Sequence, residues 1–350
     1  MSSPLLSELK EKEEWTGFLD QFGAKDVYHT YDYHHLAKGS AQPVLLAFEQ
    51  GGCAIALPLL IRQIEGTPFF DATSVYGYAG PLFRQTSPMD IHTFQKEFIR
   101  WCEEHDIVSV FTRMNPYIPD QNKIVAGLGN IILQGKVVNI DTTIPDEDQW
   151  TQYQRRLKGQ VNRARRECSV EDATTDAGLD VFISIYNENM KRVGAQESYF
   201  FDKPYYQRLM NSTDFKCTLL LARCRMSQEP IAGSMFISHQ DKTHYHLGGT
   251  RTEFLPLMPS KLLIDEMRRR AKESGQRYFN LGGGLSGRHD SLFTFKASFS
   301  NDHKDFYLWN LIVNQEIYDK LSVGIDKTAP LPYFPLYRSN ARLTSKRQPL

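Results

Sequence analysis

The feature that most constrains the fold is that both halves of the chain carry the same order of structural signals. Each half contains a β-hairpin pattern, a further strand, a helix with apolar spacing and a closing strand. In the first half these signals fall at residues 43–49, 53–64, 67–78, 88–105 and 107–114. In the second half they fall at residues 215–224, 231–238, 244–247, 260–274 and 277–281. The alternative is chance similarity of short helix–strand pieces.

A duplication of this kind predicts an α+β protein with two similar domains, each a mixed, mostly antiparallel sheet flanked by helices. The length of 350 residues agrees, because single cores rarely exceed about 250–300 residues. The proline- and acid-rich run Ile-Pro-Asp-Glu-Asp from Ile144 is the expected boundary. We therefore expect domains over residues 1–146 and 147–325, a helix over 149–167, and an irregular tail over 326–350.

The composition excludes few functions. Forty-one basic residues balance forty-one acidic residues, so the net charge favours neither DNA nor a membrane as partner. The five cysteines are scattered without CxxC spacing, which argues against a disulfide framework and against a metal site and fits the cytoplasm. We expect neither a secretory signal nor a transmembrane segment, which leaves peripheral membrane contact open.

The stretch from Leu281 to Lys296 carries most of the chemistry. Gly282, Gly283 and Gly284 open a loop that matches G-x-G-x-x-G. A dinucleotide-binding domain would need further βαβ units after it, and too little of the chain remains. What the glycines offer is close approach of the backbone to a ligand, and a helix start favours an anion or a developing oxyanion. The alternative is a tight turn that uses glycine for positive φ.

Lys296 is predicted on the apolar side of a short helix. If residues 291–299 are helical, Leu292, Phe295, Lys296 and Phe299 share one face. A lysine there either snorkels, with its stem on apolar surface and its ammonium in water, or serves a ligand beside the glycines.

Several runs resemble one family in order along the chain. They are His-Tyr-His-Leu-Gly-Gly-Thr from His244, Pro-Ser-Lys-Leu-Leu from Pro259, Tyr-Phe-Asn-Leu-Gly-Gly-Gly from Tyr278, Asp-Ser-Leu-Phe-Thr-Phe-Lys-Ala-Ser-Phe from Asp290, the segment around Arg192 and Tyr199, and Tyr-Gly-Tyr-Ala-Gly-Pro from Tyr76. Together they resemble FemABX-type transferases of the GNAT acyltransferase superfamily. The resemblance covers most of the chain. It implies two tandem GNAT-like domains and transfer of an acyl or aminoacyl group to an amine, often on a peptidoglycan or other cell-envelope precursor.

The chain departs from the family pattern at two points. The chain lacks the long helical arm of some members. It also lacks the Q/R-x-x-G-x-G/A loop of acetyl-CoA enzymes before the 260–274 helix. The resemblance therefore implies either acyl-CoA or aminoacyl-tRNA as co-substrate, and we expect no tightly bound cofactor.

The resemblance also assigns roles. The Phe-Lys pair of the family falls on Phe295 and Lys296, which implies that they hold the acyl-bearing substrate and stabilise the tetrahedral intermediate. Candidate proton acceptors are His246, His289 and Asp290, although Asp290 is equally suited to cap the following helix and one of His244 and His246 is expected to face solvent. The expected substrate-binding residues are Phe295, Arg288, His289, Gly282, Gly283, Gly284, Arg192, Tyr199, Tyr76 and Tyr78, the last two on one face of a strand.

The helix expected at residues 149–167 is basic, with Arg155, Lys158 and Arg166 close to one side. This side suits phosphates of tRNA, CoA or a nucleotide-sugar, and a solvated surface helix is the alternative. The sequence thus predicts a cytoplasmic N-acyltransferase that acts on an amine of a polysaccharide or envelope precursor, such as an amino-sugar nucleotide. A non-catalytic nucleotide-sugar or RNA-binding protein on the same fold is the alternative function.

Overall fold

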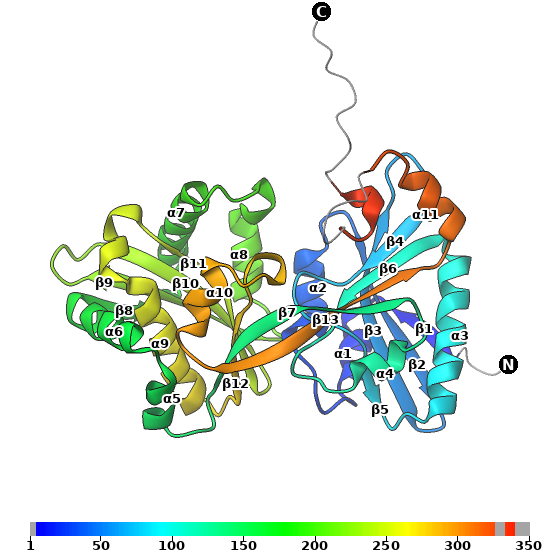
Figure 1. The fold of residues 1–350 in the computed structure, drawn as a ribbon, viewed down its shortest axis with the longest axis horizontal. Coiled ribbons are helices and arrows are strands. Elements are labelled where there is room, and N and C mark those ends of the chain that lie inside the picture. Colours follow the sequence, from blue (N-terminus) through cyan, green and yellow to red (C-terminus); the bar gives the residue numbers. More distant parts are fainter. Residues whose placement is uncertain (1–4, 326–332, 340–350) are drawn as a thin grey trace, which may run out of the picture. The chain divides into compact units, whose positions relative to one another are not determined.

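The computed structural model describes residues 5–325 and 333–339, and in it the chain forms two compact units (Figure 1). The first unit combines the residues up to 133 with those from 306 onward, and the second comprises residues 134–305. Each unit contains a mixed sheet flanked by helices. This confirms the expected α+β fold with two similar halves.

The first unit is built around strands in the order β1-β2-β3-β4-β6-β13, with β5 paired to β3. All of its described pairs are antiparallel except β4 and β6. In chain order its elements are β1 (Leu6–Leu9), α1 (Lys12–Leu19), η1 (Val27–His29), α2 (Tyr31–Ala37), β2 (Gln42–Gln50), β3 (Cys53–Gln63), β4 (Phe70–Thr73), β5 (Leu82–Arg84), α3 (Pro88–Glu104), β6 (Ile107–Arg113), α4 (Gln121–Val125), the start of β7 (Asn130–Asp141), the end of β13 (Asp302–Ile312), α11 (Gln315–Leu321) and η5 (Leu336–Arg338).

The second unit has strands in the order β7-β12-β11-β10-β9-β8. Its described pairs are antiparallel except β11 and β12. Besides the shared strands, its elements are α5 (Asp146–Gln152), α6 (Arg155–Glu167), β8 (Cys168–Asp172), α7 (Asp176–Arg192), η2 (Glu197–Tyr199), α8 (Lys203–Met210), β9 (Lys216–Cys224), β10 (Pro230–His239), β11 (Lys242–Thr250), η3 (Thr252–Leu257), α9 (Pro259–Glu273), β12 (Tyr278–Gly282), η4 (Leu285–Gly287) and α10 (Ser291–Ala297).

Both units contain one parallel pair, and in each a long helix connects its two strands. Parallel neighbours cannot be joined by a tight turn, so the chain must cross over the sheet between them. Helix α3 precedes β6 in the first unit, and α9 precedes β12 in the second. The equivalent position of these pairs confirms that the repeated pattern in the sequence reflects repeated structure.

The two units do not coincide with the expected division of the chain into residues 1–146, 147–325 and 326–350. Strand β7 pairs with β12, with Asn139 opposite Asn280, so residues 134–146 belong to the second unit. Strand β13 pairs with β6, with Leu308 opposite Arg113, so residues after 305 return to the first unit. The acidic run at Ile144 therefore follows a core strand of the second unit.

The helix expected over residues 149–167 is two helices. Tyr153 between them has extended backbone angles, and Gln154 donates its amide to the carbonyl of Ser298 instead of continuing a helix. Tyr153 is buried and its hydroxyl donates to Asp265 of α9 over 3.1 Å. The break lets one aromatic side chain enter the core while α6 packs separately.

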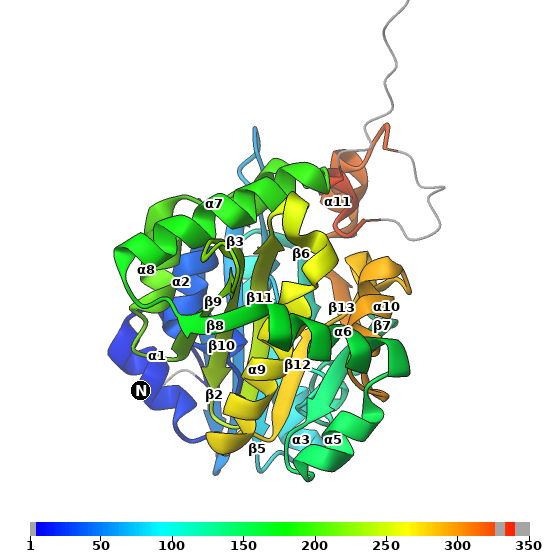
Figure 2. The same ribbon diagram turned by 90° about the vertical axis from the view of Figure 1, so that its left-hand side faces the viewer.

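Helices cover both faces of the second unit's sheet (Figures 1 and 2). On β10, Phe236 belongs to the apolar cluster that α6 and α9 complete, whereas Gly233 faces Phe182 of α7. Alternate residues of a strand point to opposite faces, so one strand serves both helix layers. Gly233 is required here, because a side chain would begin 2.6 Å from the Phe182 ring.

Part of the expected irregular tail is packed against the first unit. In the segment 333–339, Arg338 pairs with buried Asp71, which also binds Arg62. The Tyr337 hydroxyl lies 2.8 Å from the Ser109 hydroxyl. Residues 326–332 and 340–350 lie outside the described part of the chain.

The assignment of β7 predicts a large stability loss when its buried end is truncated. Ile140 is 2% exposed in the core of the second unit, whereas Ile132 on the same strand is 38% exposed. We expect Ile140→Ala to lower the free energy of unfolding by about 2–5 kcal/mol. The matched control Ile132→Ala should cost less than about 1 kcal/mol. Urea unfolding followed by circular dichroism measures both, and equal effects would contradict the assignment.

Candidate functional site

The parallel pair of the second unit separates soon after it forms. Strands β11 and β12 pair through Lys242–Tyr278, Thr243–Phe279 and His244–Asn280 only. Beyond this point β11 continues to Thr250 beside β10, and β12 ends at Gly282. The two strands therefore leave backbone and side chains of both available at one end of the pair.

A buried polar pair marks the last contact between these strands. His244 and Asn280 are each 2% exposed, and the Asn280 amide nitrogen lies 3.2 Å from His244 Nδ1. The Asn280 side-chain oxygen accepts a hydrogen bond from the amide of Gly282 over 2.8 Å. Asn280 thus fixes the start of the glycine loop. Sequence reasoning missed it, although a lone asparagine between Phe279 and Leu281 in a buried strand is a signal.

His246 lies two residues beyond His244, where the pairing with β10 is irregular between Met235 and Phe236. Its Nε2 lies 3.1 Å from the hydroxyl of Tyr205 on α8. Burial lowers the pKa of His246 to about 4, and the nearby His244 adds to this effect. The ring is therefore neutral at pH 7. The expectation that one histidine of this pair faces solvent is wrong, because neither side chain is exposed.

Lys296 holds its ammonium group inside the second unit. The residue is 8% exposed, and Nζ donates to the carbonyl oxygen of Gly283 over 2.7 Å. Burial lowers the pKa of Lys296 to about 8, and nearby Asp290 opposes this shift. Among the described residues, no carboxylate lies within ion-pair distance of its Nζ. This is not the geometry of snorkelling, which would place the ammonium in water.

Gly282 is the last residue of β12 and lies beside the Lys296 ammonium. It lies two residues beyond Asn280, and a side chain at this position would begin 3.1 Å from Lys296 Nζ. His246 occupies the corresponding place on β11, two residues beyond His244. His246 and the Lys296 ammonium therefore lie at the same end of the parallel pair.

The buried face of α10 is shifted by one residue from the expected one. Phe293 and Lys296 are buried, whereas Leu292 is 43% exposed. Phe295 is half-buried and packs against Phe299 with ring centroids 5.8 Å apart. The helix ends at Ala297, so it is too short for its apolar spacing to define the face uniquely.

Asp290 is the N-cap of α10. One carboxylate oxygen accepts from the amide of Phe293 and the other from the amide of Leu285, both over 2.8 Å. The bond from Phe293 is the main cause that lowers the pKa of Asp290. A carboxylate with a lowered pKa and two backbone donors is a weak proton acceptor. The geometry therefore gives Asp290 the capping role that the sequence left open.

The other glycines of the loop allow it to lie against β7. A side chain on Gly283 would begin 2.7 Å from the carbonyl oxygen of Lys136, and one on Gly284 would begin 2.0 Å from that of Arg288. The Gln134 amide donates to the carbonyl of Ser286 over 2.7 Å. Close packing thus accounts for Gly283 and Gly284, and positive φ accounts for Gly282.

Arg288 and His289 lie on the same loop and are exposed. The His289 ring contacts that of Phe293 with centroids 4.2 Å apart. Both precede α10, the helix that carries Lys296. Arg192 is the last residue of α7, where it donates to Asn189, and Tyr199 ends the short turn η2.

Tyr76 and Tyr78 belong to the first unit. The expected strand over them is wrong, because β4 ends at Thr73 and both tyrosines lie in the loop that follows. In that loop the Tyr33 hydroxyl donates to the Tyr76 carbonyl, and the Asn115 side-chain amide donates to the Tyr78 carbonyl. The two residues therefore do not share a strand face.

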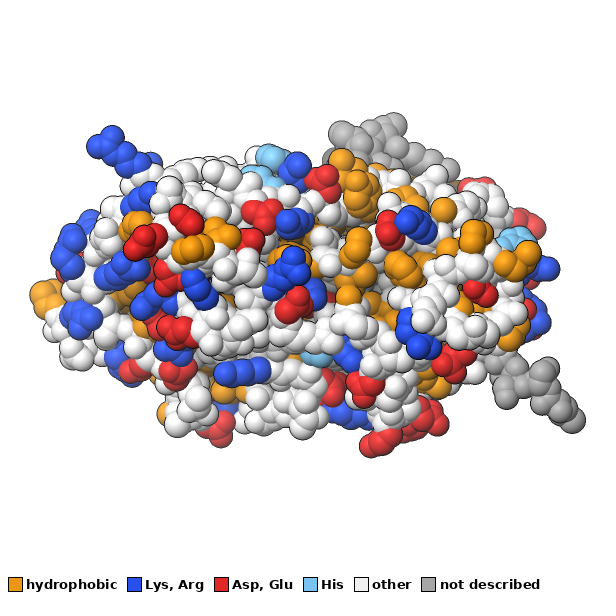
Figure 3. Space-filling view, turned by 90° about the horizontal axis from the view of Figure 1, so that it is seen from below, with side chains coloured by type: hydrophobic (Ala, Val, Ile, Leu, Met, Phe, Trp, Pro, Cys, Tyr) orange, Lys and Arg blue, Asp and Glu red, His pale blue; other side chains and the backbone are white. Residues whose placement is uncertain are grey.

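The basic residues of α6 form two groups. Arg165 binds buried Asp265 over 2.6 Å, and Lys158 donates to the carbonyl of Thr151. The remaining four are exposed and, within the described residues, have no acidic partner in ion-pair distance. They lie within an arc of about 100° at 100° per residue, and they are Arg155, Arg156, Arg163 and Arg166. Elsewhere acidic and basic side chains lie side by side, as Figure 3 shows for one face.

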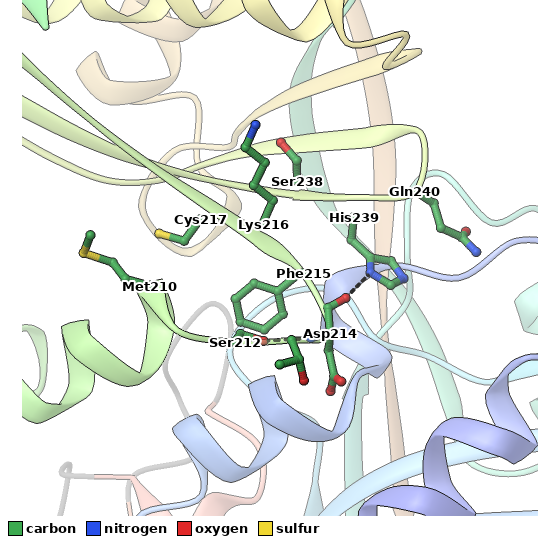
Figure 4. A pocket seen from close by; sticks show the side chains of 10 residues that line it. Met210, Ser212, Asp214, Phe215, Lys216, Cys217, Ser238, His239 and Gln240 are labelled. Atoms are coloured by element: carbon green, nitrogen blue, oxygen red, sulfur yellow. Dashed lines mark hydrogen bonds between the residues drawn. The ribbon is translucent and has the colours of Figure 1, made fainter. Parts of the chain in front are cut away.

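An open hollow of about 550 Å³ lies at the other end of the strands (Figure 4). It forms where α8 leads into β9 and where β10 ends, and His239 Nδ1 lies 2.9 Å from the carbonyl oxygen of Asp214 there. None of the residues expected from the sequence lines it. Its lining is Met210, Ser212, Thr213, Asp214, Phe215, Lys216, Cys217, Ser238, His239 and Gln240.

Two structural features are absent from the part of the chain that the structure describes. No helix there combines the length and apolar character that a bilayer crossing requires. No group of three or more His, Cys, Asp and Glu side chains there is arranged to hold a metal ion.

Comparisons with known proteins agree on the fold. Residues 151–295 match the family model of the GNAT acetyltransferase domain. A structure of FemX superposes with a TM-score of 0.71 at 13% identity, covering 90% of this chain and 99% of that one. The C-terminal domain of an Agrobacterium fabrum protein assigned as a lysylphosphatidylglycerol synthetase gives 0.58 at 13% identity, covering 89% and 96%. A Bacteroides thetaiotaomicron protein of unknown function gives 0.56 at 9% identity, covering 87% and 99%.

No sequence among the curated proteins matches this chain. The family match includes α6, both strands of the parallel pair, the glycine loop and most of α10. Residues 151–295 thus match the GNAT acetyltransferase domain, and the fold of the chain is similar to that of FemX.

Proposed function

We propose that this protein is a cytoplasmic N-acyltransferase that moves an acyl or aminoacyl group from acyl-CoA or aminoacyl-tRNA to an amine of a cell-envelope or polysaccharide precursor. An amino-sugar nucleotide and a peptidoglycan precursor are examples of such acceptors. The fold shared with FemX, and with a domain named for the synthesis of lysylphosphatidylglycerol, supports transfer of an acyl or aminoacyl group.

The observation that carries the proposal is the buried ammonium of Lys296. A cation without a carboxylate partner is costly to bury, so its presence at the open end of a parallel pair needs a compensating function. Its pKa of about 8 leaves it mostly protonated at pH 7. One N–H binds Gly283, and an ammonium has three, so two remain for a ligand.

The reaction requires a positive donor where negative charge develops. A neutral amine attacks the carbonyl carbon of the ester or thioester, and the carbonyl oxygen becomes an oxyanion. In the proposal, the Lys296 ammonium stabilises that oxyanion. Collapse of the intermediate breaks the bond to the donor oxygen or sulfur and leaves an amide on the acceptor.

In this proposal His246 accepts the proton that the attacking amine must lose. Its pKa of about 4 keeps the ring neutral and able to accept a proton at pH 7. The hydroxyl of Tyr205 orients Nε2, and Tyr205 is itself stacked on Phe201 with centroids 4.1 Å apart. Because its pKa is low, protonated His246 must release the proton quickly. The leaving group of the donor is suited to accept that proton.

The arginines of α6 favour a phosphate-rich donor. Four unpaired guanidinium groups on one side of a helix attract a polyphosphate or an RNA backbone more strongly than an uncharged thioester arm. This observation also supports the alternative function, a non-catalytic RNA- or nucleotide-sugar-binding protein. Product formation separates the two functions, since the alternative predicts binding without transfer.

Loss of the Lys296 charge should slow the chemical step. We expect Lys296→Met to lower single-turnover transfer by about 10²–10³-fold, the usual effect of removing one oxyanion donor. His246→Gln should lower it by about 10²-fold or more. Lys304→Met is the matched control, because Lys304 in the same unit pairs with Asp302 on the surface. Intact-mass detection of an acylated amino-sugar nucleotide, with pooled donors, measures the rate. A Lys296→Met enzyme at the wild-type rate would remove this residue from catalysis.

The same substitution should stabilise the fold at neutral pH. The pKa of Lys296 falls from 10.5 to about 8 on folding, which corresponds to a cost of about 3 kcal/mol when the group is charged in both states. Loss of the donor to Gly283 offsets about 1 kcal/mol. We therefore expect Lys296→Met to gain about 2 kcal/mol in the free energy of unfolding below pH 8.

The stabilisation by Lys296→Met should depend on pH, because the pKa of Lys296 differs between the folded and the unfolded state. Wild-type stability rises from pH 8 to 10.5, because the unfolded chain then binds the proton that the folded chain has lost. The advantage of Lys296→Met should therefore shrink across this window. Urea unfolding of both proteins at several pH values measures it. An advantage that is constant with pH would show that the ammonium is not desolvated.

If aminoacyl-tRNA is the donor, the exposed arginines of α6 predict a salt effect on tRNA binding. Arg163→Gln should weaken tRNA binding and reduce the slope of log K against log salt by about 1. Arg223→Gln is the control, since Arg223 pairs with Glu171 in the same unit. Filter binding at several salt concentrations measures the slopes. Equal slopes for wild type and both variants would exclude α6 as the tRNA-binding surface and favour acyl-CoA.

A further inference from the structure

Two of the five cysteines lie directly opposite each other on neighbouring strands. Cys168 begins β8, Cys224 ends β9, and the antiparallel register of these strands pairs the two residues. Residues that are directly opposite in an antiparallel pair point to the same face of the sheet. Both side chains belong to the apolar cluster of the second unit, and both are thiols in this structure. The sheet therefore places two thiols next to each other on one face.

The hydrogen bonds between these strands show which kind of pair the cysteines form. At one end of β8 the Arg225 amide donates to the Glu167 carbonyl over 2.8 Å. At the other end the Ala173 amide donates to the Leu219 carbonyl over 3.0 Å. Hydrogen-bonded and non-hydrogen-bonded positions alternate along an antiparallel pair. Counting from either bond, the two cysteines occupy a non-hydrogen-bonded position, the kind at which side chains approach most closely.

This position matches the geometry that a disulfide requires. Opposite residues at a non-hydrogen-bonded position have Cα atoms about 4.5 Å apart. A disulfide joins residues whose Cα atoms lie about 4.4–6.8 Å apart. A bond between Cys168 and Cys224 therefore needs rotation of two side chains and no rearrangement of the strands.

Cys224 is the thiol that an oxidant reaches first. It is 5% exposed, against 1% for Cys168, and it begins the turn that carries Met226, which is 92% exposed. The Gln228 amide donates to the Cys224 carbonyl over 2.8 Å and closes this turn. The pKa of Cys224 is lowered, chiefly by a hydrogen bond from the backbone of Ser227, whereas burial raises the pKa of Cys168 to about 11. Since the thiolate is the reactive form, Cys224 is the better nucleophile.

Strand β8 is placed where a covalent bond has an effect. It is the last strand in the order of the described sheet, and it pairs with β9. Edge strands open locally more readily than central strands, because they are held from one side. Helix α6 runs directly into it, since Glu167 ends the helix and Cys168 begins the strand. A bond from β8 to β9 would therefore fix both the edge strand and the end of α6.

We propose that Cys168 and Cys224 form a reversible thiol–disulfide site that a low-molecular-weight disulfide oxidises. The Cys224 thiolate attacks one sulfur of the oxidant, which gives a mixed disulfide and releases one thiolate. Cys168 then loses its proton and attacks the Cys224 sulfur, which forms the cross-strand bond and releases the second thiolate. The protein gives up two electrons and two protons, and the oxidant becomes two thiols. In a reducing cytoplasm both residues stay thiols.

Incubation of the full chain with glutathione disulfide, followed by alkylation in denaturant and intact-mass measurement, tests the site. We expect three alkylated cysteines instead of five, and peptide mapping should find the bond between Cys168 and Cys224. Reduced glutathione should restore all five. The midpoint of thermal unfolding should rise by about 5–15 °C on oxidation, because the bond closes a long loop in the unfolded chain.

Three single variants distinguish this pair from the other cysteines. Cys168→Ala should stop at the mixed disulfide, with one glutathione on Cys224. Cys224→Ala should form no bond at Cys168. Cys217→Ala is the matched control, because Cys217 lies on the same strand but opposite Ile237 of β10, and this variant should form the cross-strand bond as wild type does.

The peptide map of the wild-type protein decides the proposal even if a variant fails to fold. Five alkylated cysteines after treatment with glutathione disulfide, or a bond mapped to another pair, overturns the site. An unchanged or lower unfolding midpoint in the oxidised protein contradicts the fit of the bond to the native register. None of these measurements uses acyl transfer, so the site stands or falls separately from the proposed function.

Discussion

One constraint shapes each unit, namely that two neighbouring strands run in the same direction. Parallel strands need a crossover, so α3 and α9 must span their sheets before β6 and β12 begin. In the second unit the pair holds for only three residues and then separates. Asn280 and His244 close the paired part with buried polar contacts, and the glycine loop and α10 complete the open end. The position of Lys296 depends on this arrangement, because its ammonium binds the loop that begins where β12 ends.

The sequence predicted the parts that follow from local patterns. The hairpins, the α3 and α9 helices and the strands after them appear where periodicity placed them, since each has a clear repeat and a turn signal. The glycine loop with Lys296 was found because a charge on an apolar face is unusual. Partners of strands were not predictable in this way. Nothing in the residues of β7 indicates that it pairs with β12, so the expected boundary falls after residue 146, whereas the second unit begins at Gln134.

The wrong predictions at individual residues have different causes. Helix α10 is seven residues long, and over two turns the apolar spacing fits a face through Leu292 as well as one through Phe293. Tyr76 and Tyr78 alternate as in a strand, yet side chains from Tyr33, Asn115 and Gln121 satisfy the carbonyls that a sheet would otherwise bind. Asn280 is informative only once its strand is known to end beside a glycine loop. The errors at the tyrosines and at Asn280 concern long-range partners, which a window of neighbouring residues does not contain.

The first unit is made of two separate stretches of the chain, and this has a consequence for synthesis on the ribosome. The second unit occupies one continuous stretch, residues 134–305, and is complete once that stretch has emerged. The first unit begins earlier in the chain but lacks its last strand until Phe306–Ile312 follows. At about 5–20 residues per second, the first unit waits roughly ten to thirty seconds with the edge of β6 unpaired. The part of the protein that is made first is therefore the part that finishes folding last, and its exposed edge is where nascent chains need protection.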